Sequence, residues 1–202
     1  SHGDRIEVRA GTYAEDVASD KPVTIHGTGH DVFLAGVYRW QDLPAGRELR
    51  IVNVSVGHVL LERCDGAVLL TELDMTSSVV DQGHLSATDC HDVRVRDCAI
   101  ASRLPVAVEV EASRVELVGC TVTGVRGYDG DFFSSGGPGG DGVHVRVDGF
   151  LSVAASTILE RGISIIWGPR LKQLPRVIEG QVSILGAPVS AHEALIIVLA
   201  PA

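Results

Sequence analysis

An internal repeat is the feature of this chain that most constrains its fold. Seven segments of eight residues align without gaps, and each has apolar residues at its first, third and eighth positions, apart from His30 in the first copy. Successive copies begin about 20 to 26 residues apart, except where insertions intervene, and that period is typical of solenoids. The copies are residues 23–30, 49–56, 68–75, 93–100, 115–122, 151–158 and 182–189.

The fifth position of the repeat predicts a corner. Five of the seven copies carry glycine, asparagine or aspartate there, and these types tolerate a left-handed backbone. Apolar alternation changes phase at the same point, so two short strands should meet at one left-handed residue. Glu72 and Ala155 break the rule and should be strained or belong to different turns. The other corner residues are Gly27, Asn53, Asp97, Gly119 and Gly186.

A third short strand lies just upstream of each copy, and these strands should form a first-strand column. Stacked coils turn each column into a parallel sheet. We therefore expect an all-β fold, a single-stranded right-handed parallel β-helix of about seven coils with three short strands per coil. A leucine-rich repeat has a similar period, but its leucine and asparagine consensus is missing here. The upstream strands are residues 6–8, 32–34, 60–62, 85–87, 108–110, 143–147 and 163–166.

The predicted organisation is a single domain over residues 1–202 that is an excerpt of a larger protein. The chain opens on a predicted strand at residues 5–8 and ends on another at residues 195–199, with no obvious capping element. Three insertions should interrupt the coils, at residues 36–48, 123–142 and 167–181.

Composition agrees with strands joined by tight turns. The chain is 45% hydrophobic but only 4% aromatic, and it has 23 glycines. A net charge of −9 argues against nucleic acid or an anionic membrane as the main partner. There is no long apolar run and no signal peptide, so we expect no membrane insertion. The four cysteines lack Cys-x-x-Cys spacing, which gives zinc little support and leaves the compartment undetermined.

The opening of the chain resembles the first coil of the pectin-lyase-like right-handed β-helix superfamily, the carbohydrate-binding and sugar-hydrolase repeat group. The resemblance rests on GDRIEV at residues 3–8, GTY at 11–13 and KPVTIHG at 21–27, and the pattern then extends over nearly the whole chain. It implies the fold more specifically than an activity, because this superfamily includes lyases, hydrolases, epimerases, phage tailspikes and non-catalytic interaction domains.

The catalytic strings of that superfamily do not carry over to this chain. The polygalacturonase-like strings Asn-Thr-Asp, Asp-Asp, Gly-His-Gly and Arg-Ile-Lys are absent. The pectate-lyase-like Arg-x-Pro-x-x-Arg is half matched by Arg103 and Pro105, with Val108 in place of the second arginine. These departures put a lyase in doubt.

One charged cluster is a candidate catalytic site. Alternation places Glu109, Glu111, His144 and Arg146 on the outward face of adjacent first strands, about 4.8 Å apart along the stack. A carboxylate, imidazole and guanidinium could bind a polar sugar or perform general acid and base catalysis. The alternative is a solvated strand face with paired opposite charges.

The insertion at residues 123–142 offers two further candidates. Asp129, Asp131 and Asp141 could supply oxygen ligands to calcium, although their spacing does not match an EF-hand and no cofactor is otherwise indicated. Phe132 and Phe133 stand among glycines and could stack on sugar, or pack against the solenoid instead.

The tryptophans are candidate ligand-binding residues, and the cysteines are candidates for buried thiols or a disulfide. Trp40 and Trp167 each lie near basic residues in a predicted insertion, a combination suited to an acidic polysaccharide, and the alternative is local packing. Cys98 and Cys120 share an inward column and should be buried free thiols. Cys64 and Cys90 lie in neighbouring coils and could approach disulfide distance.

These observations favour a non-catalytic β-helix domain that presents a surface to carbohydrate or to a protein partner. The runner-up is a lyase or glycoside hydrolase that acts on an acidic polysaccharide through the Glu109 cluster. A third interpretation is a structural spacer or oligomerisation module, in which Ile6 and Ile197 at the open ends pair between chains, end to end or side by side.

Overall fold

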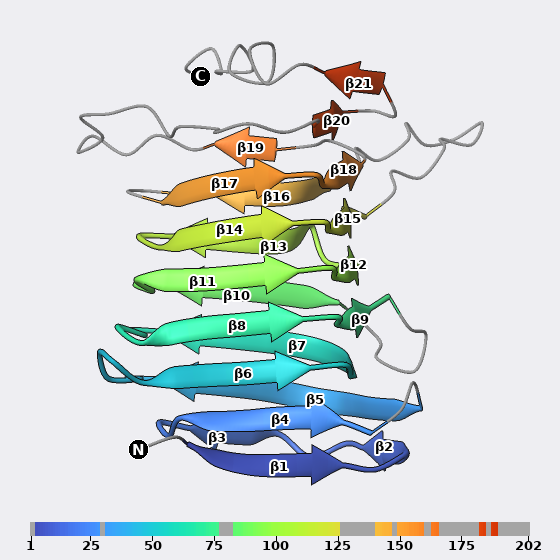
Figure 1. The fold of residues 1–202 in the computed structure, drawn as a ribbon. Helices are drawn as coiled ribbons and strands as arrows, with labels where there is room; N and C mark the ends of the chain where they lie inside the picture. The colour runs from blue at the N-terminus through green and yellow to red at the C-terminus, as the bar shows by residue number, and fades with distance from the viewer. Residues whose placement is uncertain are drawn as a thin grey trace, which may run out of the picture.

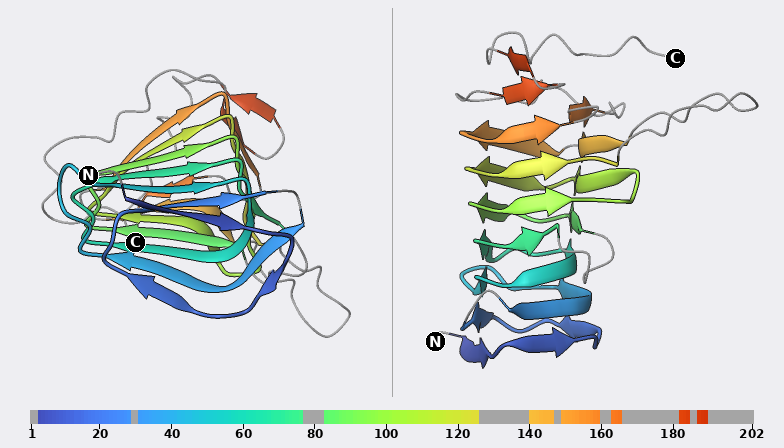
Figure 2. Two further views of the ribbon diagram at one scale, coloured as in Figure 1. Left: turned by 60° about the horizontal axis from the view of Figure 1, so that its bottom comes forward. Right: turned by 90° about the vertical axis from the view of Figure 1, so that its right-hand side faces the viewer.

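The computed structural model describes residues 3–28, 31–76, 83–125, 140–146, 149–159, 163–165, 182–184 and 187–189. These residues form strands and turns and contain no helix. The strands stack in parallel as a β-solenoid of about five turns (Figures 1 and 2). The all-β and parallel parts of the fold prediction are therefore confirmed.

One wall of the solenoid is a seven-stranded parallel sheet, which we call sheet A. Its inward residues are the first and third positions of the repeat, for example Val68 and Leu70, which are fully buried. Strands β6, β8, β11, β14 and β17 stack in the register expected from the repeat. In stacking order the strands are β1 (Asp4–Val8), β4 (Val23–Gly27), β6 (Glu48–Val52), β8 (Ala67–Thr71), β11 (Asp92–Arg96), β14 (Arg114–Val118) and β17 (Phe150–Ala154).

The other two walls belong to one bent sheet of twelve strands, sheet B. Strands β5 (Val32–Gln41) and β7 (Ser55–Glu62) run through both walls. The short column also contains β2 (Gly11–Tyr13), β9 (Asp74–Met75), β12 (Ala99–Ala101), β15 (Thr121–Thr123) and β18 (Thr157–Leu159). The long column also contains β3 (Val17–Ser19), β10 (His84–Thr88), β13 (Val106–Glu111), β16 (Asp141–Val145) and β19 (Ile163–Ile165).

Two upstream strands lie in other columns than predicted. Ile6 was expected in the first-strand column, but β1 pairs with β4 in sheet A, where Ile6 registers with Ile25. Leu34 registers with Val56, which places residues 32–34 in the short column. All three walls share the same apolar alternation, so the local sequence does not distinguish one wall from the next.

Two predicted boundaries also change. Residues 37–41 were assigned to an insertion at 36–48, but they continue β5 and pair with β7, so only residues 42–47 connect to β6. The seventh copy was expected to stack in parallel, but β20 (Val182–Ile184) and β21 (Ala187–Val189) form an antiparallel pair. The insertion at 167–181 lies outside the described residues, as does most of that at 123–142.

The predicted left-handed corner is confirmed at Asn53, Asp97 and Gly119, with φ of 54°, 52° and 65°. Glu72 and Ala155 adopt the same conformation, at 54° and 49°, and so are strained as L-residues. Gly186 lies outside the described residues.

Gly27 has no left-handed backbone, so that corner prediction was wrong. A Cβ built there would lie 2.0 Å from the carbonyl oxygen of Asn53. Glycine is required at this position by the close approach of the next turn, because any side chain would collide with its backbone.

Candidate functional site

The predicted charged cluster is partly assembled on the outer face of the long column. Glu109 of β13 registers with His144 of β16. Nε of Arg146, just after β16, lies 3.0 Å from Oε1 of Glu109. Three of the four predicted residues therefore meet. The fourth, Glu111, registers with Thr88 of β10, and among the described residues its carboxylate makes no ion pair with Arg146.

His144 is more buried than an outward strand position normally is. Only 8% of its surface is exposed, and its buried Nε2 atom has no hydrogen-bond partner among the described residues. Its Nδ1 atom lies 3.9 Å from Oδ2 of Asp141. A buried imidazole nitrogen without a partner is costly, so this site has an unused hydrogen-bonding position beside the Glu109 carboxylate.

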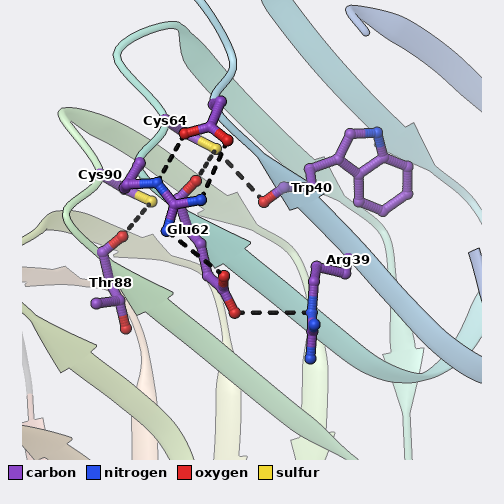
Figure 3. A network of polar contacts seen from close by, with 8 residues as sticks. Arg39, Trp40, Glu62, Cys64, Thr88 and Cys90 are labelled. Carbon is purple, nitrogen blue, oxygen red and sulfur yellow. Dashed lines mark hydrogen bonds and ion pairs between the residues drawn. The ribbon is translucent and has the colours of Figure 1, made fainter. Parts of the chain in front are cut away.

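The position of Trp40 favours the local-packing interpretation over the ligand-binding one. Its side chain points inward from β5, is 1% exposed and stacks on Tyr38 with ring centroids 6.3 Å apart. The Cys64 thiol donates a hydrogen bond to the Trp40 carbonyl oxygen at 3.7 Å (Figure 3). Trp40 is a core residue, because residues 37–41 form a strand whose alternate side chains enter the solenoid.

Several predicted ligand residues fall outside the described part of the chain. Phe132, Phe133, Asp129, Asp131 and Trp167 are all in this group. Asp141 is described, at the start of β16, beside His144. In the described ranges no three carboxylate, imidazole or thiol groups gather as a metal site would require.

Each of the four cysteines is buried and comes directly after a left-handed residue. Cys98 and Cys120 are buried free thiols, as predicted. The Cys98 thiol accepts the Leu73 N–H at 3.4 Å, and Ser156 accepts the Cys120 N–H in the same way at 2.9 Å. Small polar side chains therefore bridge successive turns here, which explains cysteine or serine in this column.

Cys64 and Cys90 follow a second corner and are also buried and free (Figure 3). The hydrogen bond with Cys90 lowers the pKa of the Cys64 thiol to about 7, and burial opposes this. The same contact and burial raise the pKa of Cys90. Each thiol also donates to a backbone carbonyl, Cys64 to Trp40 and Cys90 to Thr88.

An outer pocket on sheet A is the feature that sequence reasoning missed. It has a volume of about 250 Å³ and lies over β11, β14 and β17. Val93 registers with Val115, and Val115 registers with Leu151. The residues directly before and after each of these three point outward, so they form two columns that cross the three strands. Its lining is His91, Asp92, Val93, Arg94, Arg114, Glu116, Phe150 and Ser152.

The polar groups of this outer pocket are held in place by their neighbours. Arg94 donates two hydrogen bonds to Asp92, at 3.0 and 2.8 Å. The Arg114 guanidinium lies 5.3 Å from the centre of the Phe150 ring, a cation–π geometry. These contacts limit side-chain motion, which lowers the entropy cost of binding a ligand.

The fold and the pocket define the class as a parallel β-solenoid with a pocket on its outer face. Comparison with known proteins found no matching family model, no matching curated protein and no matching solved structure. Among the described residues, no helix has the length and apolar character to cross a membrane.

Proposed function

We propose that this chain is a non-catalytic β-solenoid domain that binds an uncharged carbohydrate in the outer pocket of sheet A. The observation that carries this proposal is the composition of the pocket wall. It combines carboxylates, guanidiniums, an imidazole and a phenyl ring on three adjacent strands. Sugar hydroxyls need both donors and acceptors, and sugar C–H faces pack on aromatic rings. The wall offers all of these groups within one concave site.

Charge balance favours an uncharged sugar over a uronate. The carboxylates of Asp92 and Glu116 offset the guanidiniums of Arg94 and Arg114. Arg94 is already paired with Asp92, so a carboxylate on the ligand would compete with the Asp92 carboxylate for the Arg94 guanidinium. A uronate would also face Glu116, and that like-charge contact discriminates against it.

Binding of neutral and uronate-containing oligosaccharides on a glycan array, followed by calorimetry with the best neutral binder, tests this proposal. Glu116→Gln and Phe150→Ala should each weaken binding about tenfold or more, because each removes a contact inside the pocket. Glu48→Gln is the matched control. It removes an outward carboxylate of sheet A that lies outside the pocket, where Glu48 pairs with Arg50 on β6. The proposal fails if no neutral glycan binds, or if the control weakens binding equally.

We also propose that the solenoid is right-handed, has seven coils and belongs to the pectin-lyase-like superfamily. Sheet A has seven strands, which supports one coil for each. Parallel strands joined by a crossover are right-handed in about 98% of cases, which supports the handedness. An experimental structure of the chain tests all three statements.

The Glu109 cluster supports a second candidate function, cleavage of an acidic polysaccharide. The observation in its favour is the unpartnered Nε2 of His144 beside the Glu109–Arg146 pair. Arg146 would hold a substrate carboxylate, while Glu109 or His144 would transfer the proton. Glu109→Gln should then abolish turnover of an oligouronate panel, while Glu111→Gln on the same strand retains it. Absence of turnover in the unmodified chain removes this candidate.

A further inference from the structure

The end of the solenoid that contains the N-terminus has three free strand edges. In the described structure, β1 pairs only with β4, and β2 and β3 pair only with β5. Figure 1 places these three strands at the same end of the stack, and Figure 2 shows them around one turn. Free edges of this kind present unpaired N–H and C=O groups that can template another strand.

The interior of the solenoid is also accessible at this end. A cavity of about 340 Å³ is lined mainly by apolar side chains, among them Ile6, Val8, Val17 and Leu34. Ile6 points toward the interior, in register with Ile25, yet it is 49% exposed. It is the one large apolar side chain that is exposed among the described residues. This end therefore combines hydrogen-bonding edges with an uncovered apolar centre.

Strand β1 is complementary to itself when two copies run antiparallel. A two-fold axis through Ile6 would place Arg5 of each copy opposite Glu7 of the other copy. The dimer would therefore contain two such Arg5–Glu7 contacts. Arg5 and Glu7 both face outward, and within one chain they already form an ion pair of 3.0 Å. The axis would also place the two Ile6 side chains together over the cavity. Directly opposed unlike charges and apolar pairs both stabilise an antiparallel ladder.

We propose that two copies of this chain associate head to head through this end, with β1 antiparallel to β1 of the second copy. The same axis exchanges the two other walls, so that β2 of one copy lies over β3 of the other. Both strands have three residues, so their lengths match. The occupant of the apolar end is thus the apolar end of a second copy. This proposal does not depend on the carbohydrate site, which lies on β11, β14 and β17.

The geometry also predicts that association stops at two copies. An antiparallel β1 pair uses the same surface on both partners, so it is an isologous contact and closes. Head-to-tail stacking would keep the strands parallel and would place Arg5 and Glu7 against other residues. That arrangement would continue into a fibre.

Sedimentation equilibrium of the full 202-residue chain over a range of concentrations tests the proposal. The unmodified chain should be a dimer. Arg5→Glu or Glu7→Arg alone should weaken self-association about tenfold or more, because each places like charges opposite each other twice. An equimolar mixture of the two variants should form a one-to-one heterodimer, because each charge of one partner then faces its opposite on the other.

Arg50→Glu is the matched control, because Arg50 and Glu48 form the same kind of pair on β6, inside the stack. It should remain dimeric, and circular dichroism should show the same sheet content in all variants. A monomeric unmodified chain, an assembly larger than two, or two single variants that fail to associate when mixed would each overturn the proposal.

Discussion

Left-handed residues define two corners in the middle turns of the solenoid, and only one of these corners was predicted. Besides the Asn53 column, Asp42, Arg63, Asp89 and Ala112 have φ between 46° and 56° at the end of the long column. At both corners the backbone N–H still donates to the next turn, as Arg63 does to Thr88 at 2.9 Å. The chain thus bends without losing a ladder hydrogen bond, and this offsets the strain of the left-handed conformation.

Replacing a strained corner residue by glycine should stabilise the fold. Ala155 has φ of 49° and an exposed methyl group, so Ala155→Gly removes strain without losing packing. The strain is about 1–2 kcal/mol, and the extra entropy of unfolded glycine offsets about 0.5–1 kcal/mol of it. We expect urea denaturation to show a gain of about 0.5–1 kcal/mol. Ala154→Gly, one residue earlier in extended β17, should instead lose about that amount.

Among the elements, β7 and β10 bring two histidines into contact on the outer face of the long column. His58 registers with His84, and their rings lie 6.1 Å apart. Burial and the charge of His84 lower the pKa of His58 below its ordinary value of 6.5, and Asp16 opposes this. Protonation of His58 is therefore less favourable in the folded chain than in the unfolded chain.

Stability should consequently fall as the pH falls below about 6.5. In that window the unfolded chain binds a proton at His58 before the folded chain does, so protons favour unfolding until the pH drops below the folded pKa. We expect His58→Gln to flatten the slope of unfolding free energy against pH between 7 and 5 in urea titrations. The slope from this group should remain below the one-proton limit of about 1.4 kcal/mol per pH unit. An unchanged slope in His58→Gln would contradict the assignment.

The sequence predicted inward columns better than outward sites, for a physical reason. Val68 and Val93 repeat because every turn must fill the same core, so their period is visible along the chain. Arg114 and Phe150 meet only through the register of β14 and β17, 36 residues apart, and no periodic constraint acts on outward positions. Ligand binding and local packing were both open for Trp40 for a related reason, because an aromatic beside an arginine resembles a surface site until its strand is known.

At the scale of the whole molecule, each turn contacts only its neighbours, so stability should vary along the stack. Interior strands such as β8 and β11 are paired on both sides, whereas in the part of the chain that the structure describes β1 is paired only with β4. In such a solenoid the terminal turns lose contacts on one face and open at lower free energy than the middle. The apolar end that we propose to be covered by a second copy should thus be the least protected part of a single copy.

Hydrogen exchange of the Arg5→Glu variant, which we expect to be monomeric, measures this gradient. Amides of Leu70 and Val95, buried in β8 and β11, should exchange slowest, and those of β1 should exchange fastest. In the unmodified chain, amides of β1 should become more protected as concentration rises, because the dimer pairs their free edge, while Leu70 and Val95 keep their rates. Uniform protection along the stack would mean instead that the solenoid opens as one cooperative unit, since nearest-neighbour contacts alone cannot protect a terminal strand as well as an interior one.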